Sequence, residues 1–191
     1  LNDLVENLKR LPGIGNKTAL RLALFILNDL EKEEAASLSE ALISVKENLS
    51  FCEICGVIKE DACPICQDNK RDQSTIMVVE TIKDLLVFEN TNNYFGLYHI
   101  LGGTIDFSKG IEPDDLKIDS LIKRANSNKE IILALNGAVD GQLTSNYIEE
   151  LLKDKDVTLS KIAYGLPVGA DLSFADDKTL KVALQNRMKV K

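Results

Sequence analysis

The stretch Ser74–Glu80, which reads STIMVVE, decides the fold class of this 191-residue chain. Up to Val79 it is a continuous run rich in apolar and β-branched side chains. A run of this kind predicts a strand that is covered on both faces. Such strands are typical of parallel sheets, because helical crossovers lie over both faces of the sheet. The stretch therefore indicates the first strand of an α/β layer.

Downstream of this strand, helical and strand patterns alternate. We expect helices over 81–89, 116–125, 145–152 and 176–188, and strands over 94–101, 130–135 and 157–163. Regular alternation of this kind predicts an α/β domain with a mostly parallel sheet. The segment 67–73, just before the first strand, is polar and is predicted to be a linker.

Upstream, the periodicity is helical throughout. Apolar residues at helical spacing predict helices over 2–10, 16–30 and 35–49, with Asn16 as the N-cap of the second. The apolar stripe of the second helix comprises Leu20, Ala23, Leu24, Leu27 and Leu30. That of the third comprises Leu38, Leu42, Val45 and Leu49.

The turn between the first two helices carries a nucleic-acid signal. It lies in Leu11–Ala19, which reads LPGIGNKTA. Gly13 and Gly15 allow backbone geometry closed to other residues and close approach of a ligand. The turn also presents free N–H groups at a helix start, and Lys17 and Arg21 share a face one turn further on. This pattern favours a helix-hairpin-helix that grips the DNA backbone, although an αα-hairpin that merely turns on glycine has the same outline.

Net charge argues the other way. The chain carries a formal charge of −7, which disfavours a polyanionic partner because DNA binding depends on neutralising phosphates. A phosphate responds to the local field, however. Between positions 9 and 21 there is no acidic residue and there are four basic ones, Lys9, Arg10, Lys17 and Arg21.

All four cysteines fall in one short segment, in the pattern Cys52-x2-Cys55-x7-Cys63-x2-Cys66. Two CxxC pairs supply four thiolates, which close a tetrahedral site with no open position and so predict a structural metal. Zinc is the expected ion and iron the chemical alternative, while four unrelated buried cysteines would not need this spacing. Clustered thiols, no secretory leader and no apolar run long enough for a membrane span predict a soluble, cytoplasmic protein.

Carboxylates follow several of the predicted strands. Glu80 ends the first strand, Asp140-Gly141-Gln142 follows the strand over 130–135, and Asp171 follows the last. Functional groups gather at the carboxyl ends of strands in open α/β sheets, so these acids are candidates for one metal site. Solvated loop acids are the other interpretation. The single histidine, His99, has no sequence partner, and we assign it no role.

The order of these parts resembles the RecR family of bacterial recombination mediators. The hairpin LPGIGNKTALRLA precedes CEIC and CPIC, and IMVVE opens the α/β part; YFGLYHILGG over 94–103 and GLPVGADL over 165–172 also match. The resemblance implies a Toprim fold, shared with topoisomerases and primases, for the α/β part. The expected parts are a helical region with the helix-hairpin-helix over 1–50, a C4 zinc finger over 51–67, a Toprim domain over 74–170 and a C-terminal helical segment over 171–191.

The resemblance also implies a function. RecR-like proteins are not known as enzymes; they form ring-like oligomers, act with RecO and RecF, and help load RecA onto single-stranded DNA. Carried over by position, Lys17 and Arg21 would contact single- and double-stranded DNA beside Gly13 and Gly15. The four cysteines would hold one structural zinc ion per chain. Glu80 would be the Toprim glutamate, and with Asp140 it would serve partner docking or hold a weak Mg²⁺.

Three departures qualify this picture. Catalytic Toprim domains carry a DxD pair, whereas Gln142 stands here in place of the second carboxylate. Tyr164 stands where RecR-like chains often have arginine, and the gap between the two CxxC pairs is one residue short. The missing carboxylate argues against the chief rival function, a Toprim-type metal-dependent nuclease. A zinc module that only bridges proteins is the second rival.

Overall fold

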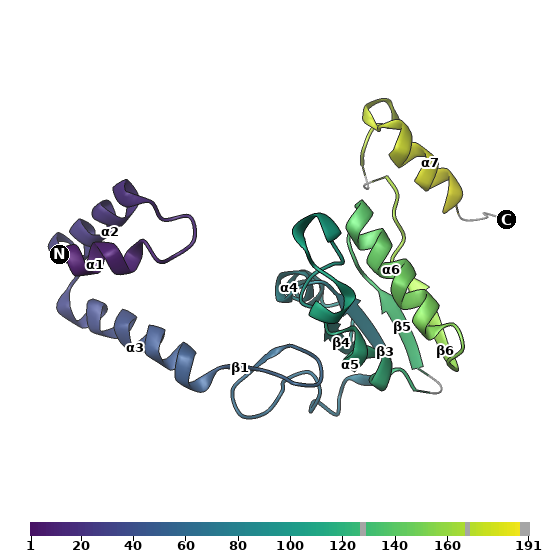
Figure 1. The fold of residues 1–191 in the computed structure, drawn as a ribbon, viewed down its shortest axis with the longest axis horizontal. Coiled ribbons are helices and arrows are strands. Elements are labelled where there is room, and N and C mark those ends of the chain that lie inside the picture. The colour runs from purple at the N-terminus through teal and green to yellow at the C-terminus, as the bar shows by residue number, and fades with distance from the viewer. Residues whose placement is uncertain (127–128, 167–168, 188–191) are drawn as a thin grey trace. The chain divides into compact units, whose positions relative to one another are not determined.

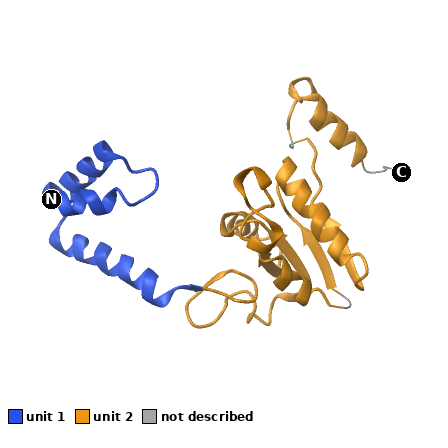
Figure 2. Ribbon diagram, viewed as in Figure 1, with its two compact units in different colours: residues 1–50 blue, residues 51–191 orange. Residues whose placement is uncertain are grey.

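The structure is a computed structural model that describes residues 1–126, 129–166 and 169–187 (Figure 1). It divides into two compact units, Leu1–Ser50 and Phe51–Lys191 (Figure 2). Among the described residues, no helix combines the length and apolar character needed to cross a membrane.

The first unit is helical, as predicted. It contains α1 (Asn2–Leu8), α2 (Asn16–Asn28) and α3 (Lys32–Asn48), and α1 packs against α2. The predicted N-cap was wrong: Gly15 holds that position with φ −87° and ψ 177°, and its carbonyl accepts the Ala19 N–H at 2.9 Å. Asn16 is thus already helical. The third helix begins earlier than predicted because Glu31 and Glu34 form a capping box before it.

The predicted apolar stripes of α2 and α3 are largely exposed within the single chain. Of the residues of this unit, only Ala19 and Ala23 are buried. The exposed apolar side chains on the two helices are Leu20, Leu24, Phe25, Leu27, Leu38, Leu42, Ile43 and Val45. Periodicity predicts that a stripe exists, but burial needs a second layer, which three helices of one chain do not supply.

A small two-stranded sheet, formed by β1 (Ser50–Phe51) and β2 (Ile58–Lys59), lies at the junction of the two units in the sequence. We call the segment 51–67, which contains β2 and the four cysteines, the cysteine knuckle. The expected polar linker after it was wrong in part, because β3 already begins at Asp72. Arg71, just before β3, forms an ion pair with Glu89 (Nη2 to Oε2, 2.5 Å) and is not a free linker residue.

A four-stranded, wholly parallel sheet follows, with the order β4-β3-β5-β6. Its elements are β3 (Asp72–Val79), α4 (Ile82–Thr91), β4 (Gly96–Ile100), α5 (Ile118–Arg124), β5 (Lys129–Leu133), α6 (Val139–Leu152) and β6 (Val157–Lys161). Short 3₁₀ turns lie at Phe107–Lys109, Pro113–Asp115 and Leu172–Phe174. The prediction of an α/β layer with a mostly parallel sheet is confirmed.

The helices lie on both faces of this sheet. The connection from β3 to β4 runs one way along the sheet and the connections from β4 to β5 and β5 to β6 run the other way. Right-handed crossovers therefore place α4 on one face and α5 and α6 together on the opposite face (Figure 1). The direction reverses at β3, so β3 and β5 flank a topological switch point, where open α/β sheets place their sites.

The largest boundary error in this unit concerns helix α6. Helix α6 begins at Val139 rather than at the predicted Ser145. The prediction started too late because Gly141, a residue type that usually breaks helices, lies in the first turn. A Cβ on Gly141 would lie only 2.2 Å from the Asn136 carbonyl oxygen, so the glycine permits the close contact that starts the helix. The last helix, α7 (Asp177–Gln185), is capped by Asp176, and its predicted end at Met188 lies outside the described residues.

The core of the second unit is aliphatic and centred on the sheet. Ile76, Val78 and Val79 of β3 are fully buried, which agrees with the prediction that this strand is covered on both faces. The largest other side chains with almost no exposure are Tyr98, His99, Leu101, Ile105, Leu121, Ile131, Leu133, Leu135 and Ile148.

Candidate functional sites

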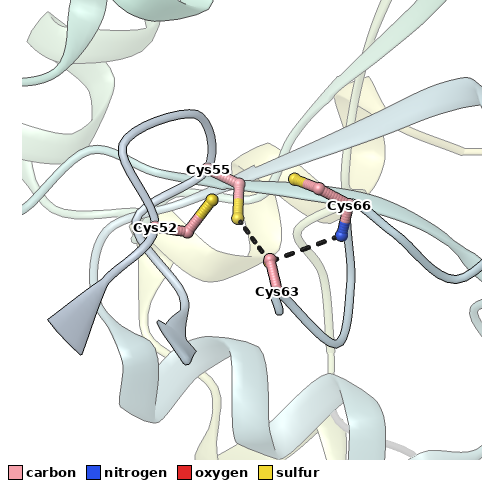
Figure 3. A group of neighbouring side chains, drawn as sticks. All are labelled: Cys52, Cys55, Cys63 and Cys66. Atoms are coloured by element: carbon pink, nitrogen blue, oxygen red, sulfur yellow. Dashed lines mark hydrogen bonds between the residues drawn. The ribbon is translucent and has the colours of Figure 1, made fainter. Parts of the chain in front are cut away.

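The four cysteines converge on one point. Their Sγ atoms all lie within 4.8 Å of one another, and Figure 3 shows the two CxxC turns facing each other. Zn–S bonds of about 2.3 Å in a tetrahedron require sulfurs ~3.8 Å apart, so the cluster fits a four-thiolate metal site. Cys52, Cys55 and Cys63 are buried and Cys66 is half-buried. The sequence thus identified a group that can hold a metal ion.

Backbone geometry builds this site. Gly56 follows the first CxxC pair with φ +79°, a region that favours glycine, and a Cβ there would lie 3.1 Å from Cβ of Ile100. The Gly56 N–H donates to the Cys52 carbonyl at 2.8 Å, and the Cys66 N–H donates to Cys63 Sγ at 3.4 Å. The Gly56 hydrogen bond thus closes the first CxxC turn, and the Cys66 N–H points at a sulfur that would carry thiolate charge.

The thiols resist ionising together. Burial raises the pKa of Cys63, and the Cys66 thiol together with burial raises the pKa of Cys55. Burial also raises the pKa of Cys52, but the backbone N–H groups of Cys55 and Ile54 outweigh it and bring the value down to about 7. A full set of four thiolates therefore needs a cation between them.

The knuckle also closes the edge of the sheet. The Ile100 N–H of edge strand β4 donates to the Cys55 carbonyl at 2.8 Å. Two arginines cover the outward carbonyls of the same strand: Arg71 Nη1 bonds Gly96 O at 3.1 Å, and Arg124 Nη1 bonds Tyr98 O at 2.8 Å. Covering an edge prevents unwanted strand pairing, and here it ties the metal site to the core.

The hairpin turn lies between α1 and α2. Gly13 has φ +81° and needs to be glycine, whereas Gly15 has φ −87°, which any residue adopts. The prediction that both glycines exploit restricted backbone geometry was therefore wrong for Gly15. No atom lies within 4 Å of a Cβ built on either glycine, so both leave open space for a ligand.

The start of α2 suits an anion. It has no side-chain cap and no acidic residue in its first turn, and the first N–H groups of a helix lack intrahelical partners. Lys17 and Arg21 are exposed, and no ion-pair partner for either exists among the described residues. Lys9 differs, because its Nζ is paired with Glu6 at 2.9 Å. Fewer basic side chains are therefore free to contact a phosphate than the four basic residues between positions 9 and 21.

At the switch point, one asparagine joins two of the predicted acids. The Asn136 N–H donates to Glu80 Oε1 at 2.5 Å, and its Nδ2 donates to Asp140 Oδ2 at 3.5 Å. Thr104 donates to the same oxygen of Asp140 at 2.6 Å, and these hydrogen bonds lower the pKa of Asp140. We call Glu80, Asn136 and Asp140 the acidic edge. Asn136 was not predicted, because nothing in the sequence marks it.

The other candidates do not join this edge. The Asp171 carboxylate accepts from the N–H and hydroxyl of Ser173, at 2.9 and 2.8 Å, and caps its own turn. Gln142 donates from Nε2 to the Gly137 carbonyl at 2.8 Å. Within the described ranges, the cysteines are the sole group of three or more potential metal ligands. Of the two interpretations of these acids, the described residues therefore favour solvated loop acids over a metal site shared by Glu80, Asp140 and Asp171.

Two further residues are structural. His99 is fully buried, with Nε2 donating to Lys117 O at 2.8 Å and Nδ1 accepting from Arg124 at 2.9 Å. Burial lowers its pKa to about 4, so the ring is neutral. Tyr164, which replaces the arginine expected there, donates its hydroxyl to Leu135 O at 2.5 Å. Burial and the nearby Glu80 carboxylate raise the pKa of Tyr164.

Together, the hairpin, the four-cysteine knuckle and the parallel sheet define a class: a Toprim protein with a helix-hairpin-helix and a knuckle that can hold a metal ion. Family models agree with this description. The Toprim domain matches residues 74–163, the RecR helix-hairpin-helix matches 1–46, and the RecR C-terminal model matches 165–188.

Relatives that match nearly the whole chain show its family. The chain is 44% identical over 190 residues to the recombination protein RecR of Enterococcus faecalis, covering 98% of this chain and 96% of that protein. It is 43% identical to RecR of Phytoplasma mali, covering 96% and 92%, and 41% identical to RecR of Lacticaseibacillus casei, covering 98% and 96%. The chain belongs to the RecR family.

Proposed function

We propose that this protein is a DNA-binding recombination mediator that acts in DNA repair without chemistry of its own. The names of its relatives support a role in recombination. The observation that carries the proposal is the open hairpin, where uncapped N–H groups and the exposed Lys17 and Arg21 lie in the first half of α2. These groups recognise phosphates, which single- and double-stranded DNA have in common, and they do not read bases.

The hairpin binds DNA by contacting the backbone from α2. Gly13 and Gly15 let the strand approach the main chain, and Lys17 and Arg21 neutralise flanking phosphates. One short basic segment on a chain of charge −7 is a poor binder alone. Several copies in a ring-like homo-oligomer raise avidity without new contacts. The exposed apolar stripes of α2 and α3 support such assembly.

The knuckle holds one structural zinc ion per chain through Cys52, Cys55, Cys63 and Cys66. Four thiolates select a soft or borderline ion, and zinc is the usual choice, with iron as the alternative. The ion supplies folding energy and not a Lewis-acid site, because four protein ligands leave no position for substrate. Such a site suits the reducing cytoplasm, where thiols stay available to metal.

The acidic edge serves as a docking surface for a partner such as RecO. Glu80 and Asp140 are already engaged by Asn136 and Thr104, which holds both carboxylates in place. RecF is the second proposed partner, and the outcome of the complex is the loading of RecA on single-stranded DNA. The proposed parts keep the bounds expected from the sequence. Residues 1–50 bind DNA, residues 51–67 hold zinc, residues 74–170 dock the partner, and residues 171–191 form a helical tail.

The nuclease alternative requires carboxylates that hold Mg²⁺ against a phosphate. Gln142 offers a neutral amide where the Toprim pattern has its second carboxylate, and its side chain already bonds Gly137 O. A neutral ligand lowers the pull on a hard cation. The acidic edge is therefore better suited to docking than to strand cleavage.

The test is DNA affinity across salt concentrations, measured by fluorescence anisotropy with labelled single- and double-stranded oligonucleotides of unrelated sequence. Replacing Lys17 and Arg21 with glutamine should weaken binding similarly for all sequences and reduce the salt slope by about 0.7 per lost phosphate contact on single strands. Lys9→Gln is the matched control, since it removes a charge that Glu6 already pairs. A double variant that binds like the control would refute the hairpin as the DNA site.

A further inference from the structure

A groove of about 420 Å³ lies next to the acidic edge, between the loop after β4 and the start of α6. Three apolar side chains stand around it. Phe107 is 66% exposed and Val139 78% exposed, and Leu143 is 39% exposed. Asp140 lies in the same groove. Large apolar groups that meet around a concave surface mark an interaction site more often than single exposed ones do.

The loop that presents Phe107 is well braced. The Asp106 carboxylate accepts from the Ser108 N–H at 3.1 Å and pairs with Lys109 Nζ at 2.7 Å. Asp106 and Ile111 exchange backbone hydrogen bonds of 3.0 and 2.9 Å across the loop. The exposure of Phe107 thus belongs to a pre-organised turn, and pre-organisation lowers the entropy cost of binding.

The base of the groove is fixed to helix α6. The Ile105 N–H donates to Thr144 Oγ1 at 2.8 Å, which ties the loop to α6, and Thr104 donates to Asp140 Oδ2 at 2.6 Å. Both apolar walls, Phe107 on the loop and Val139 with Leu143 on α6, are therefore held at a set separation. A partner meets a surface that does not have to reorganise.

The charges of the groove select the kind of partner. Lys109 pairs with Asp106 and also interacts electrostatically with Asp140, while the hydrogen bonds to the Asp140 carboxylate come from the neutral Thr104 and Asn136. The pKa of Asp140 is lowered by those hydrogen bonds, so it stays ionised. The charged residues of the groove, Asp106, Lys109 and Asp140, therefore leave it one net negative charge. It attracts a cation and repels the phosphates of DNA.

We propose that this groove docks a segment of a protein partner. The segment places a large apolar side chain against Phe107, Val139 and Leu143, and a neighbouring lysine or arginine on the Asp140 carboxylate. The inference rests on the proposed docking role of the acidic edge. It adds the apolar contact residues and the chemistry of the partner segment.

The first test uses the ¹⁵N-labelled full chain and short synthetic peptides at millimolar concentration. The probe Gly-Ser-Leu-Arg-Phe-Ser-Gly should shift the amide signals of Phe107, Val139 and Asp140. The same peptide with glutamate in place of arginine, or with serines in place of leucine and phenylalanine, should not. The inference is wrong if the probe leaves these signals in place, if the glutamate peptide shifts them equally, or if a single-stranded oligonucleotide shifts them instead.

The second test uses calorimetry with RecO from the same organism. Phe107→Ser should weaken binding by at least about tenfold, as expected for an interface anchor, and Phe107→Leu should restore most of the affinity. Phe95→Ser is the matched control, because Phe95 is 65% exposed but lies outside the groove. The serine variants sit at exposed positions, so circular dichroism spectra should match the parent.

The results of these tests distinguish an error about the groove from an error about the docking of RecO at the acidic edge. If RecO binds and Phe107→Ser binds like Phe95→Ser, the groove is not the docking site, although a loss with Asp140→Asn would still support the acidic edge. If RecO does not bind the parent chain at all, the proposed partner is wrong, and the peptide experiment by itself decides what the groove accepts.

Discussion

Acidification should destabilise this protein through His99. The ring is fully buried, and burial lowers its pKa from 6.5 to about 4. The unfolded chain therefore takes up the proton at a higher pH than the folded chain does. The contribution of the neutral ring to stability is complete above pH 6.5 and is lost as the pH falls towards 4.

The size of the effect follows from the two pKa values. Linkage between them gives a loss of about 2 kcal/mol between pH 7 and pH 5 and a limit of roughly 3 kcal/mol below pH 4. Other groups titrate over the same range, including the cysteine knuckle, so the wild-type slope alone does not isolate His99.

The matched variant is His99→Gln. A glutamine amide can donate to Lys117 O and accept from Arg124, as the ring nitrogens do, but it does not titrate. Urea unfolding followed by far-ultraviolet circular dichroism at pH 7 and pH 5 gives the free energy of unfolding for both proteins. The wild type should lose about 2 kcal/mol more than the variant on acidification. Equal losses in the two proteins would refute the assignment of a depressed pKa to this histidine.

Three further outcomes are expected. Elemental analysis of the purified protein should give about one zinc per chain, and Cys63→Ser should remove the metal and lower the melting temperature, because metal binding is coupled to folding here; metal-free protein with unchanged stability would contradict this. Gly141→Ala should destabilise the protein by about 2 kcal/mol, an overpacking effect, because its Cβ would meet the Asn136 carbonyl oxygen at 2.2 Å. The control Gly165→Ala should be tolerated in the same urea titration, because no atom lies within 4 Å of its Cβ. Supercoiled and single-stranded DNA incubated with the protein and Mg²⁺ or Mn²⁺ should stay intact, and nicking that disappears in Glu80→Ala would promote the nuclease alternative.

Local sequence patterns predicted a feature correctly where that feature depends on residues that are close together in the sequence. The run ending at Val79 predicted a strand covered on both faces, and the structure buries it between α4 on one side and α5 with α6 on the other. The spacing of the four cysteines predicted a common site, because each CxxC turn brings its own two thiols together. Gly13 was correctly read as a turn glycine, with φ +81°.

Sequence patterns gave wrong predictions where hydrogen bonds or close contacts that the pattern does not show determine the structure. Gly141 looked like a loop residue because glycine usually breaks helices, yet it lies in the first turn of α6, where only a glycine leaves room for the close approach of Asn136. Asp171 looked like a partner of Glu80 and Asp140 because all three follow strands, but its carboxylate bonds its own turn. Position after a strand does not specify side-chain direction.

The sequence by itself determined the classes of element, the parallel α/β layer, the cluster of four cysteines and the basic hairpin, because each depends on residues within a few turns of one another. Only the tertiary structure decided which groups from distant segments meet. It joined Glu80 to Asp140 through Asn136, buried His99 with hydrogen bonds to Lys117 and Arg124, and brought Phe107 and Val139 into one groove. These pairings depend on the order of strands in the sheet and on the packing of helices over it, which local periodicity does not specify.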